Sequence, residues 1–102
     1  MLQQHTLGKT ATSLWVSSDG WTSVKYHETT VIKWNEREIV LDSGGWRTAT
    51  TRRRMNQASK QFNLDIRVFQ AGQKWFVDVY EPSATMLLRQ TLNFVDGMLI
   101  KR

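Results

Sequence analysis

Turn-forming residues divide this sequence into short apolar runs, and only one stretch has the length and periodicity of a helix. Asp19-Gly20, Gly44-Gly45 and Asp96-Gly97 are dipeptides that favour sharp reversals, because glycine adopts positive φ angles without strain. The runs between them are rich in β-branched and aromatic residues, which is typical of strands. The pattern predicts an α+β fold, a β-rich single domain of sequential antiparallel hairpins with one helix.

The apolar runs predict seven or eight strands. The expected strand regions are 14–16, 21–26, 29–41 with a polar interruption at 35–36, 64–69, 75–80, 86–95 and 98–100. In the last two regions, Leu88, Leu92 and Phe94 are expected to point inward, and Asp96-Gly97 is expected to join the strands as a hairpin.

The predicted amphipathic helix covers about residues 51–62. Its candidate N-caps are Thr48, Thr50 and Thr51, whose hydroxyls can accept from first-turn N–H groups. Met55, Ala58 and Phe62 fall on one side of a helical wheel and are expected to face the core, while Arg53 and Lys60 fall on the opposite side. Asn63 is expected to end the helix.

Length and composition favour one intracellular domain. The 102 residues are enough for a single modest core, and we expect a loose N-terminal segment at 1–12 and one globular domain at 13–102. The absence of cysteine excludes disulfides and thiolate zinc sites. No apolar run has the length of a membrane span, so we expect a cytoplasmic protein without a membrane partner.

The positive charge is concentrated in one segment. The chain carries 14 basic and 9 acidic residues, a formal net charge of +5. Five of the basic residues lie between Asp42 and Asp65, where there is no acid, and the rest of the chain is formally neutral. A concentrated basic segment favours an acidic partner, of which nucleic acid is the commonest.

The basic segment therefore supplies the predicted binding residues for nucleic acid or an acidic protein surface. They are Arg47, Arg52, Arg53, Lys60, Asn56, Gln57 and Trp46. The four cations would contact phosphates, and Asn56 and Gln57 would read base edges or extend the polar face. Trp46, directly after the Gly44-Gly45 reversal, would be an exposed contact residue.

A purely structural role for these residues is the alternative. The cations could instead pair with the carboxylates of Glu28, Glu36, Glu38 or Asp65 on a solvated helix face. Arg54 borders the apolar stripe and could lie over the core. Trp34 and Trp75 are expected to be buried, since a β-rich core needs large side chains.

No arrangement of residues in the sequence predicts catalysis, a metal site or a cofactor. His27 and Glu28 would point to opposite faces if they lay in a strand, so they would not form a hydrogen-bonded dyad. Two histidines without cysteine fall short of a zinc site. We therefore expect a protein that is not an enzyme.

Several strings resemble a pattern in small proteins encoded by bacteriophages. The strings are Tyr26-His27-Glu28-Thr29-Thr30-Val31-Ile32, Gly44-Gly45-Trp46-Arg47-Thr48, Thr50-Thr51 and Arg54-Met55-Asn56-Gln57. The resemblance covers about residues 26–62, with weaker likeness at 68–70 and 75–77. It implies a viral setting in the host cytoplasm and carries over no catalytic residue.

The sequence thus leads to a small phage-type accessory protein that binds nucleic acid through a basic helix. Two alternatives stay open. In one, the same arginines meet the carboxylates of a host protein that the phage protein binds or inhibits. In the other, the chain has a structural or assembly role in the virion and forms a homo-oligomer through exposed strand edges.

Overall fold

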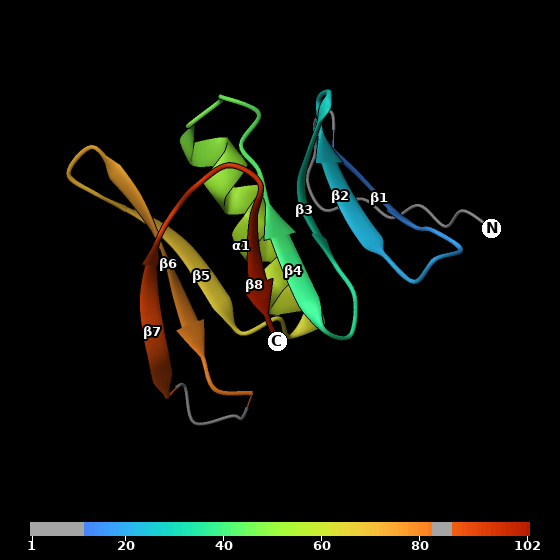
Figure 1. The fold of residues 1–102 in the computed structure, drawn as a ribbon. Helices are drawn as coiled ribbons and strands as arrows, with labels where there is room; N and C mark the ends of the chain where they lie inside the picture. Colours follow the sequence, from blue (N-terminus) through green and yellow to red (C-terminus); the bar gives the residue numbers. More distant parts are fainter. Residues whose placement is uncertain (1–11, 83–86) are drawn as a thin grey trace.

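The computed structural model describes residues 12–82 and 87–102, which form eight strands and one helix (Figure 1). In chain order the elements are β1 (Thr12–Val16), β2 (Thr22–Tyr26), β3 (Thr29–Trp34), β4 (Glu38–Leu41), α1 (Ala49–Phe62), β5 (Ile66–Ala71), β6 (Lys74–Tyr80), β7 (Leu88–Asn93) and β8 (Met98–Lys101). The predicted β-rich α+β class is confirmed. Of the expected loose segment at 1–12, only Thr12 lies within the described residues, and it begins β1.

The strands form two antiparallel sheets. One sheet has the order β1-β2-β3-β4-β8 and the other the order β5-β6-β7. The predicted pairings of β1 with β2, β3 with β4 and β5 with β6 are confirmed. His27 and Glu28 form the turn between β2 and β3 and do not lie in a strand, which corrects the premise of our dyad argument.

The predicted hairpin between β7 and β8 is wrong. β7 pairs with β6, and β8 crosses to the other sheet to pair with β4. Asp96 and Gly97 do turn the chain, but the Gly97 amide donates to the Leu41 carbonyl at 2.8 Å, which attaches the turn to the end of β4. Leu88 is exposed, against our expectation, whereas Phe94 is buried against Trp75, with the ring centroids 5.2 Å apart.

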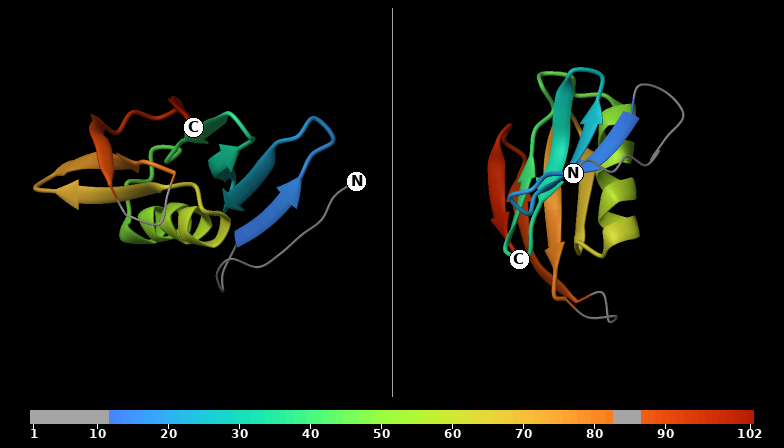
Figure 2. Two further views of the ribbon diagram at one scale, coloured as in Figure 1. Left: turned by 90° about the horizontal axis from the view of Figure 1, so that it is seen from below. Right: turned by 90° about the vertical axis from the view of Figure 1, so that its right-hand side faces the viewer.

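The helix covers one side of both sheets and closes the core (Figure 2). It packs against β5, β3 and β2. Met55 and Ala58 are fully buried, and Phe62 packs on Trp34 at 4.9 Å between ring centroids, as the helical wheel predicts. The core also contains, among others, Leu14, Val24, Ile32, Ile39 and Leu41 of the first sheet and Val68, Trp75, Val77 and Val79 of the second. Burial of Trp34 and Trp75 is thereby confirmed.

Both helix ends follow from local side-chain chemistry. Thr48 is the N-cap: its backbone is extended, and its hydroxyl accepts from the Thr51 amide. The helix therefore begins at Ala49, two residues before the predicted start. Asn63 ends it in the left-handed conformation, with φ of 54°. Asp65 is also left-handed, with φ of 60°, so β5 begins at Ile66 and not at Leu64.

Within the described residues, no helix is long and apolar enough to span a membrane.

Candidate functional site

The exposed side of α1 carries positive charge that no ion pair within the described residues neutralises. The helix contains Arg52, Arg53, Arg54 and Lys60 and no acidic residue. Within residues 12–82 and 87–102, the ion pairs are Lys25–Glu28, Arg47–Asp96, Arg67–Asp78 and Arg89–Glu81, all of them outside the helix. The predicted alternative, in which the helix arginines pair with Glu28, Glu36, Glu38 or Asp65, is therefore wrong.

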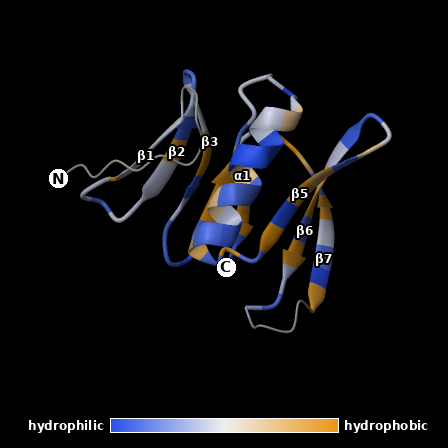
Figure 3. Cartoon of the chain, turned by 180° about the vertical axis from the view of Figure 1, so that it is seen from behind, coloured by the Kyte–Doolittle hydropathy of each residue, from blue (hydrophilic) through white to orange (hydrophobic). Residues whose placement is uncertain are grey.

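We call Arg52, Arg53 and Lys60 the basic face. Arg53 and Lys60 are exposed, and neither makes an ion pair or side-chain hydrogen bond with any residue that the structure describes. They are seven residues apart, which places them two turns and about 10 Å apart on one side of the helix. A shallow groove of about 400 Å³ runs along this side, which is hydrophilic in Figure 3; its lining residues are Ala49, Arg52, Arg53, Asn56, Gln57 and Lys60.

The two other helix arginines are held more firmly. Arg52 is half-buried, with its Cζ atom 5.3 Å from the centre of the Trp75 ring and its Nη2 donating to Gln70 Oε1 at 3.3 Å. Arg54 is only 8% exposed and donates to Thr12 and Gln57. Arg54 therefore lies over the core, as its position beside the apolar stripe indicates, and it occupies the carbonyl oxygen of Gln57.

Arg47 belongs to a network that fixes the loop before the helix. Its Nε donates to Ser43 Oγ at 3.1 Å, and its Nη2 lies 3.7 Å from Asp96 Oδ2. Its Cζ atom also lies 4.7 Å from the centre of the Phe94 ring. Because the guanidinium is engaged on several sides, Arg47 is less free to meet a phosphate than the sequence indicates.

The amide of Asn56 joins the helix to the second sheet. Its Nδ2 donates to the Val68 carbonyl and its Oδ1 accepts from the Val68 amide, both at 2.8 Å. Ser59 makes the same pair of contacts with the backbone of Ile66. These side chains cap the outer edge of β5, whose only strand neighbour within residues 12–82 and 87–102 is β6. The Asn56 amide is therefore not free to read a base edge.

Replacing Asn56 with alanine is expected to lower the free energy of unfolding by about 1–3 kcal/mol, because two backbone groups of Val68 lose their partners. The shift of the urea unfolding midpoint measures this change. Gln61→Ala, five residues further along the helix at an exposed position, is the control and should leave the midpoint nearly unchanged. Equal midpoints for the two variants would contradict the anchoring role of Asn56.

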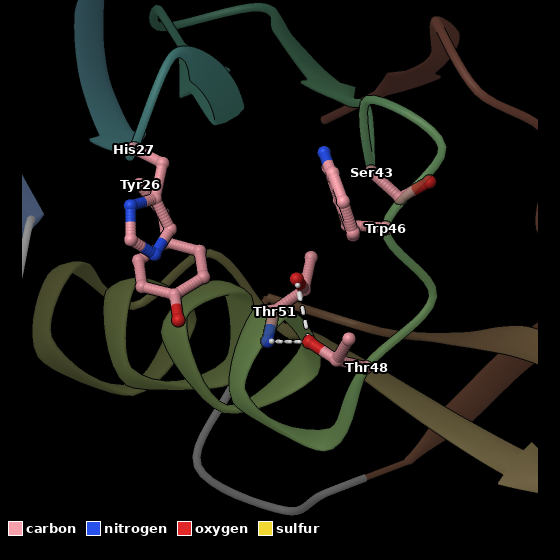
Figure 4. A pocket seen from close by; sticks show the side chains of 6 residues that line it. All are labelled: Tyr26, His27, Ser43, Trp46, Thr48 and Thr51. Carbon is pink, nitrogen blue, oxygen red and sulfur yellow. Dashed lines mark hydrogen bonds between the residues drawn. The ribbon is translucent and has the colours of Figure 1, made fainter.

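Trp46 stands at the mouth of a pocket beside the first turn of the helix. Its side chain is 70% exposed, the largest exposed fraction of any large apolar residue in the described part of the chain. The pocket has a volume of about 340 Å³, and its lining residues are Tyr26, His27, Ser43, Trp46, Thr48 and Thr51. In Figure 4 the rings of Tyr26 and His27 lie on one side of an open space, and the Trp46 indole lies on the other. We call this pocket the aromatic slot.

Contacts with neighbouring residues fix both walls of the aromatic slot in position. On one side, His27 packs on Tyr26 with ring centroids 4.4 Å apart, and the Arg54 Cζ atom lies 5.7 Å from the Tyr26 ring centre. On the other side, the backbone reverses at Gly44 and Gly45, both with positive φ, as the sequence predicts. Gly44 has no space for a side chain, because a Cβ atom there would collide with Thr29.

Asp96 fastens the Trp46 loop to the first sheet. One of its oxygens, Oδ1, accepts from both the amide and the hydroxyl of the buried Ser43, each at 2.7 Å. Burial alone raises the pKa of Asp96, but the hydrogen bonds from Ser43 and the charge of Arg47 outweigh it and lower the pKa below its ordinary value of 3.8. The carboxylate form is therefore favoured in the folded protein.

This lowered pKa predicts an acid-dependent loss of stability. The contribution of Asp96 is fully present above its unfolded pKa and is lost as the pH falls through its lower folded pKa. In Asp96→Asn, an amide oxygen can still accept from Ser43, but no carboxylate titrates. The fall in unfolding free energy between about pH 6 and about pH 3, measured by urea titration, should be smaller in this variant than in the wild type. Parallel curves would show that Asp96 contributes nothing to the acid response.

Sequence reasoning missed Tyr26, His27 and Asp96. Tyr26 and His27 lie in the phage-like strings, but no local pattern connects them with Trp46, some twenty positions further along. Asp96 is part of an Asp-Gly dipeptide, which indicated a turn and gave no sign of a contact with Ser43, 53 positions away. Within the described residues, no three His, Cys, Asp or Glu side chains are grouped in a way that could hold a metal ion.

Residues 2–101 match the model of a protein family that is described as Kyanoviridae Gp96 protein. No curated protein and no solved structure matches the chain.

Proposed function

The chain belongs to this Gp96 family and is a phage-encoded protein, and from that premise we propose that it is a non-enzymatic accessory protein that binds nucleic acid through the basic face of α1. The observation that carries the proposal is that neither Arg53 nor Lys60 forms an ion pair with any described residue, while the four ion pairs of the described chain all lie elsewhere. A polyanion would supply the missing negative charge.

The position of the arginines in the helix supports the same conclusion. Arg52 and Arg53 lie in the first turns, where the helix dipole disfavours cations by a few tenths of a kcal/mol each. The first turn contains no acid. A phosphate at this end of the helix would offset the cations and also suit the dipole, because first-turn N–H groups attract anions.

Within the predicted set of residues, the observed contacts favour different roles for different side chains. Arg53 and Lys60 are best placed to meet phosphates, whereas Arg52 lines the same groove but is half-buried and donates to Gln70. Arg47 and Asn56 are engaged within the fold, and Gln57 holds Arg54. The proposed interface therefore contacts phosphates, and its side chains make little contact with the base edges of the nucleic acid.

The test is a fluorescence-anisotropy titration of the protein into labelled single-stranded DNA, duplex DNA and RNA of equal length, at low and at physiological salt. We expect micromolar or tighter binding at low salt, with log affinity falling linearly against log salt. The slope should correspond to about two or three phosphate contacts, the number of cations on the basic face. Absence of binding at low salt would overturn the proposal and leave an acidic protein surface as the partner class.

A second candidate function, self-association in a virion assembly, is supported by β7. This strand pairs only with β6, so its other edge has no strand neighbour among the described residues. Leu87 and Leu88, at its start, are exposed. An edge strand of this kind can pair with another copy of the chain. Sedimentation velocity over a range of concentrations tests this candidate, and a concentration-independent monomer would dismiss it.

A further inference from the structure

We propose that the aromatic slot receives one unstacked base of a single-stranded nucleic acid whose phosphates lie on the basic face. The inference rests on the proposed function and adds to it the form of the nucleic acid and a second set of contact residues. A base in the slot implies that the protein prefers single-stranded nucleic acid, because the bases of a duplex are stacked and cannot enter the pocket.

The walls of the slot have the chemistry that a base requires. Tyr26 and His27 supply rings on one side and Trp46 supplies an indole on the other, so a flat ligand between them would meet π-faces on both sides (Figure 4). Every base has a π-face, and stacking on aromatic side chains does not depend on its identity. The volume of about 340 Å³ lies in the range of small-ligand pockets.

Polar groups at the floor of the slot suit the edge of such a ligand. Thr48 and Thr51 both line the pocket, and their hydroxyls hydrogen-bond each other at 3.0 Å. Thr51 is fully buried, so the exposed Thr48 hydroxyl is the one that can offer its remaining hydrogen-bonding capacity to the edge of a base. The floor therefore favours a ring with polar edges over a purely apolar one.

The slot and the basic face meet at the first turn of α1. Thr48 lines the slot, and the next residue, Ala49, lines the groove that contains Arg52, Arg53 and Lys60. A strand with one base between Trp46 and His27 would thus continue with its phosphates along the cations of the helix. This charge complementarity is the reason to assign the slot to a nucleotide and not to an aromatic side chain of a protein partner.

An exposed tryptophan on a fixed loop also fits a binding role. A side chain that is 70% exposed contributes little to the core, yet its loop is fastened by Asp96, by Arg47 and by the close approach of Gly44 to Thr29. A loop held in this way presents the indole at low entropic cost on binding.

The experiment compares two labelled probes with the full-length protein: a single-stranded oligothymidine and an oligomer of the same length in which the central positions are abasic. We expect the wild type to bind the base-bearing probe about 5- to 100-fold more tightly, the range for stacking of one base on aromatic side chains. Trp46→Ala should remove this difference and leave the affinity for the abasic probe unchanged. Trp21→Leu, at the opposite end of β2, is the matched control and should behave like the wild type.

A second variant, on the other wall of the slot, tests the same inference with a substitution that the backbone tolerates. His27 has φ of 55°, a conformation that asparagine tolerates, so His27→Asn removes the ring without straining the turn. It should also reduce the preference for the base-bearing probe. Circular dichroism of each variant shows that the fold is intact.

The outcomes separate this inference from the proposed function. Equal affinities of the wild type for both probes, with salt dependence retained, would overturn the slot and leave the basic face standing. Binding to neither probe would overturn both. Quenching of the wild-type tryptophan fluorescence by an acidic phenylalanine-containing peptide and not by oligothymidine, with the quenching lost in Trp46→Ala, would assign the slot to a protein partner and also overturn the inference.

Discussion

Replacing Met55 with alanine is expected to lower the free energy of unfolding by about 2–5 kcal/mol, the range for truncating a large buried side chain. Met55 is completely buried on the inner side of α1, in the cluster that joins the helix to both sheets. Loss of the Met55 side chain leaves a cavity. The two sheets are poorly able to fill it, because hydrogen bonds between the strands hold each sheet in place. For a chain of 102 residues this corresponds to a fall in melting temperature of about 10–30 °C.

Two controls make the Met55 result specific. Met55→Leu keeps the volume and should cost less than about 1.5 kcal/mol. Leu99→Ala removes an exposed apolar side chain on β8 and should change stability by less than about 0.5 kcal/mol. Thermal unfolding followed by circular dichroism measures all three. If Met55→Ala melted near the wild-type temperature, the helix would not be anchored in the core as described.

Reversing the charge of both Arg53 and Lys60 to glutamate is expected to weaken binding to single-stranded DNA by roughly 10- to 100-fold at physiological salt. Each lost phosphate contact removes about 0.7 from the slope of log affinity against log salt, and each introduced carboxylate repels the backbone. Anisotropy titrations at several salt concentrations measure both the affinity and the slope.

The control for this double variant is Arg37→Glu with Lys74→Glu. Both of these residues are exposed and lie outside the helix, and the change in net charge is the same. A similar loss of affinity in both double variants would show that overall charge, and not the basic face, attracts the nucleic acid. Melting temperatures should stay close to that of the wild type, because neither Arg53 nor Lys60 has a partner among the described residues.

The parts of the fold that depend on near neighbours could be predicted from the sequence. The alternation of Trp75, Val77 and Val79, the Gly44-Gly45 reversal and the two helix ends at Thr48 and Asn63 are all set by residues within a few positions of one another. Periodicity also placed Met55 inward and Arg53 outward correctly. These features are local because backbone conformation and helix capping are local.

The partner of β8 could not be predicted in this way. An Asp-Gly dipeptide between two apolar runs is typical of a hairpin, and nothing near Asp96 indicates that its carboxylate binds Ser43. The amide of Asn56 is a similar case, since a polar residue on a helix flank suggests solvent or a ligand until the edge of β5 is placed beside it. In both cases a distant segment decides the role of the side chain.

The contact between Ser43 and Asp96 bears on the order in which the molecule folds. The two residues are 53 positions apart, whereas the helix and the early hairpins are held by neighbours in sequence. Closing a long loop costs more entropy than closing a short one, so distant contacts are expected to form late. A folding intermediate with a formed helix would already display its positive charge but would lack the rigid loop at its start. Under the function proposed above, the chain would attract a polyanion before the aromatic slot, which is proposed to select single strands, is in place.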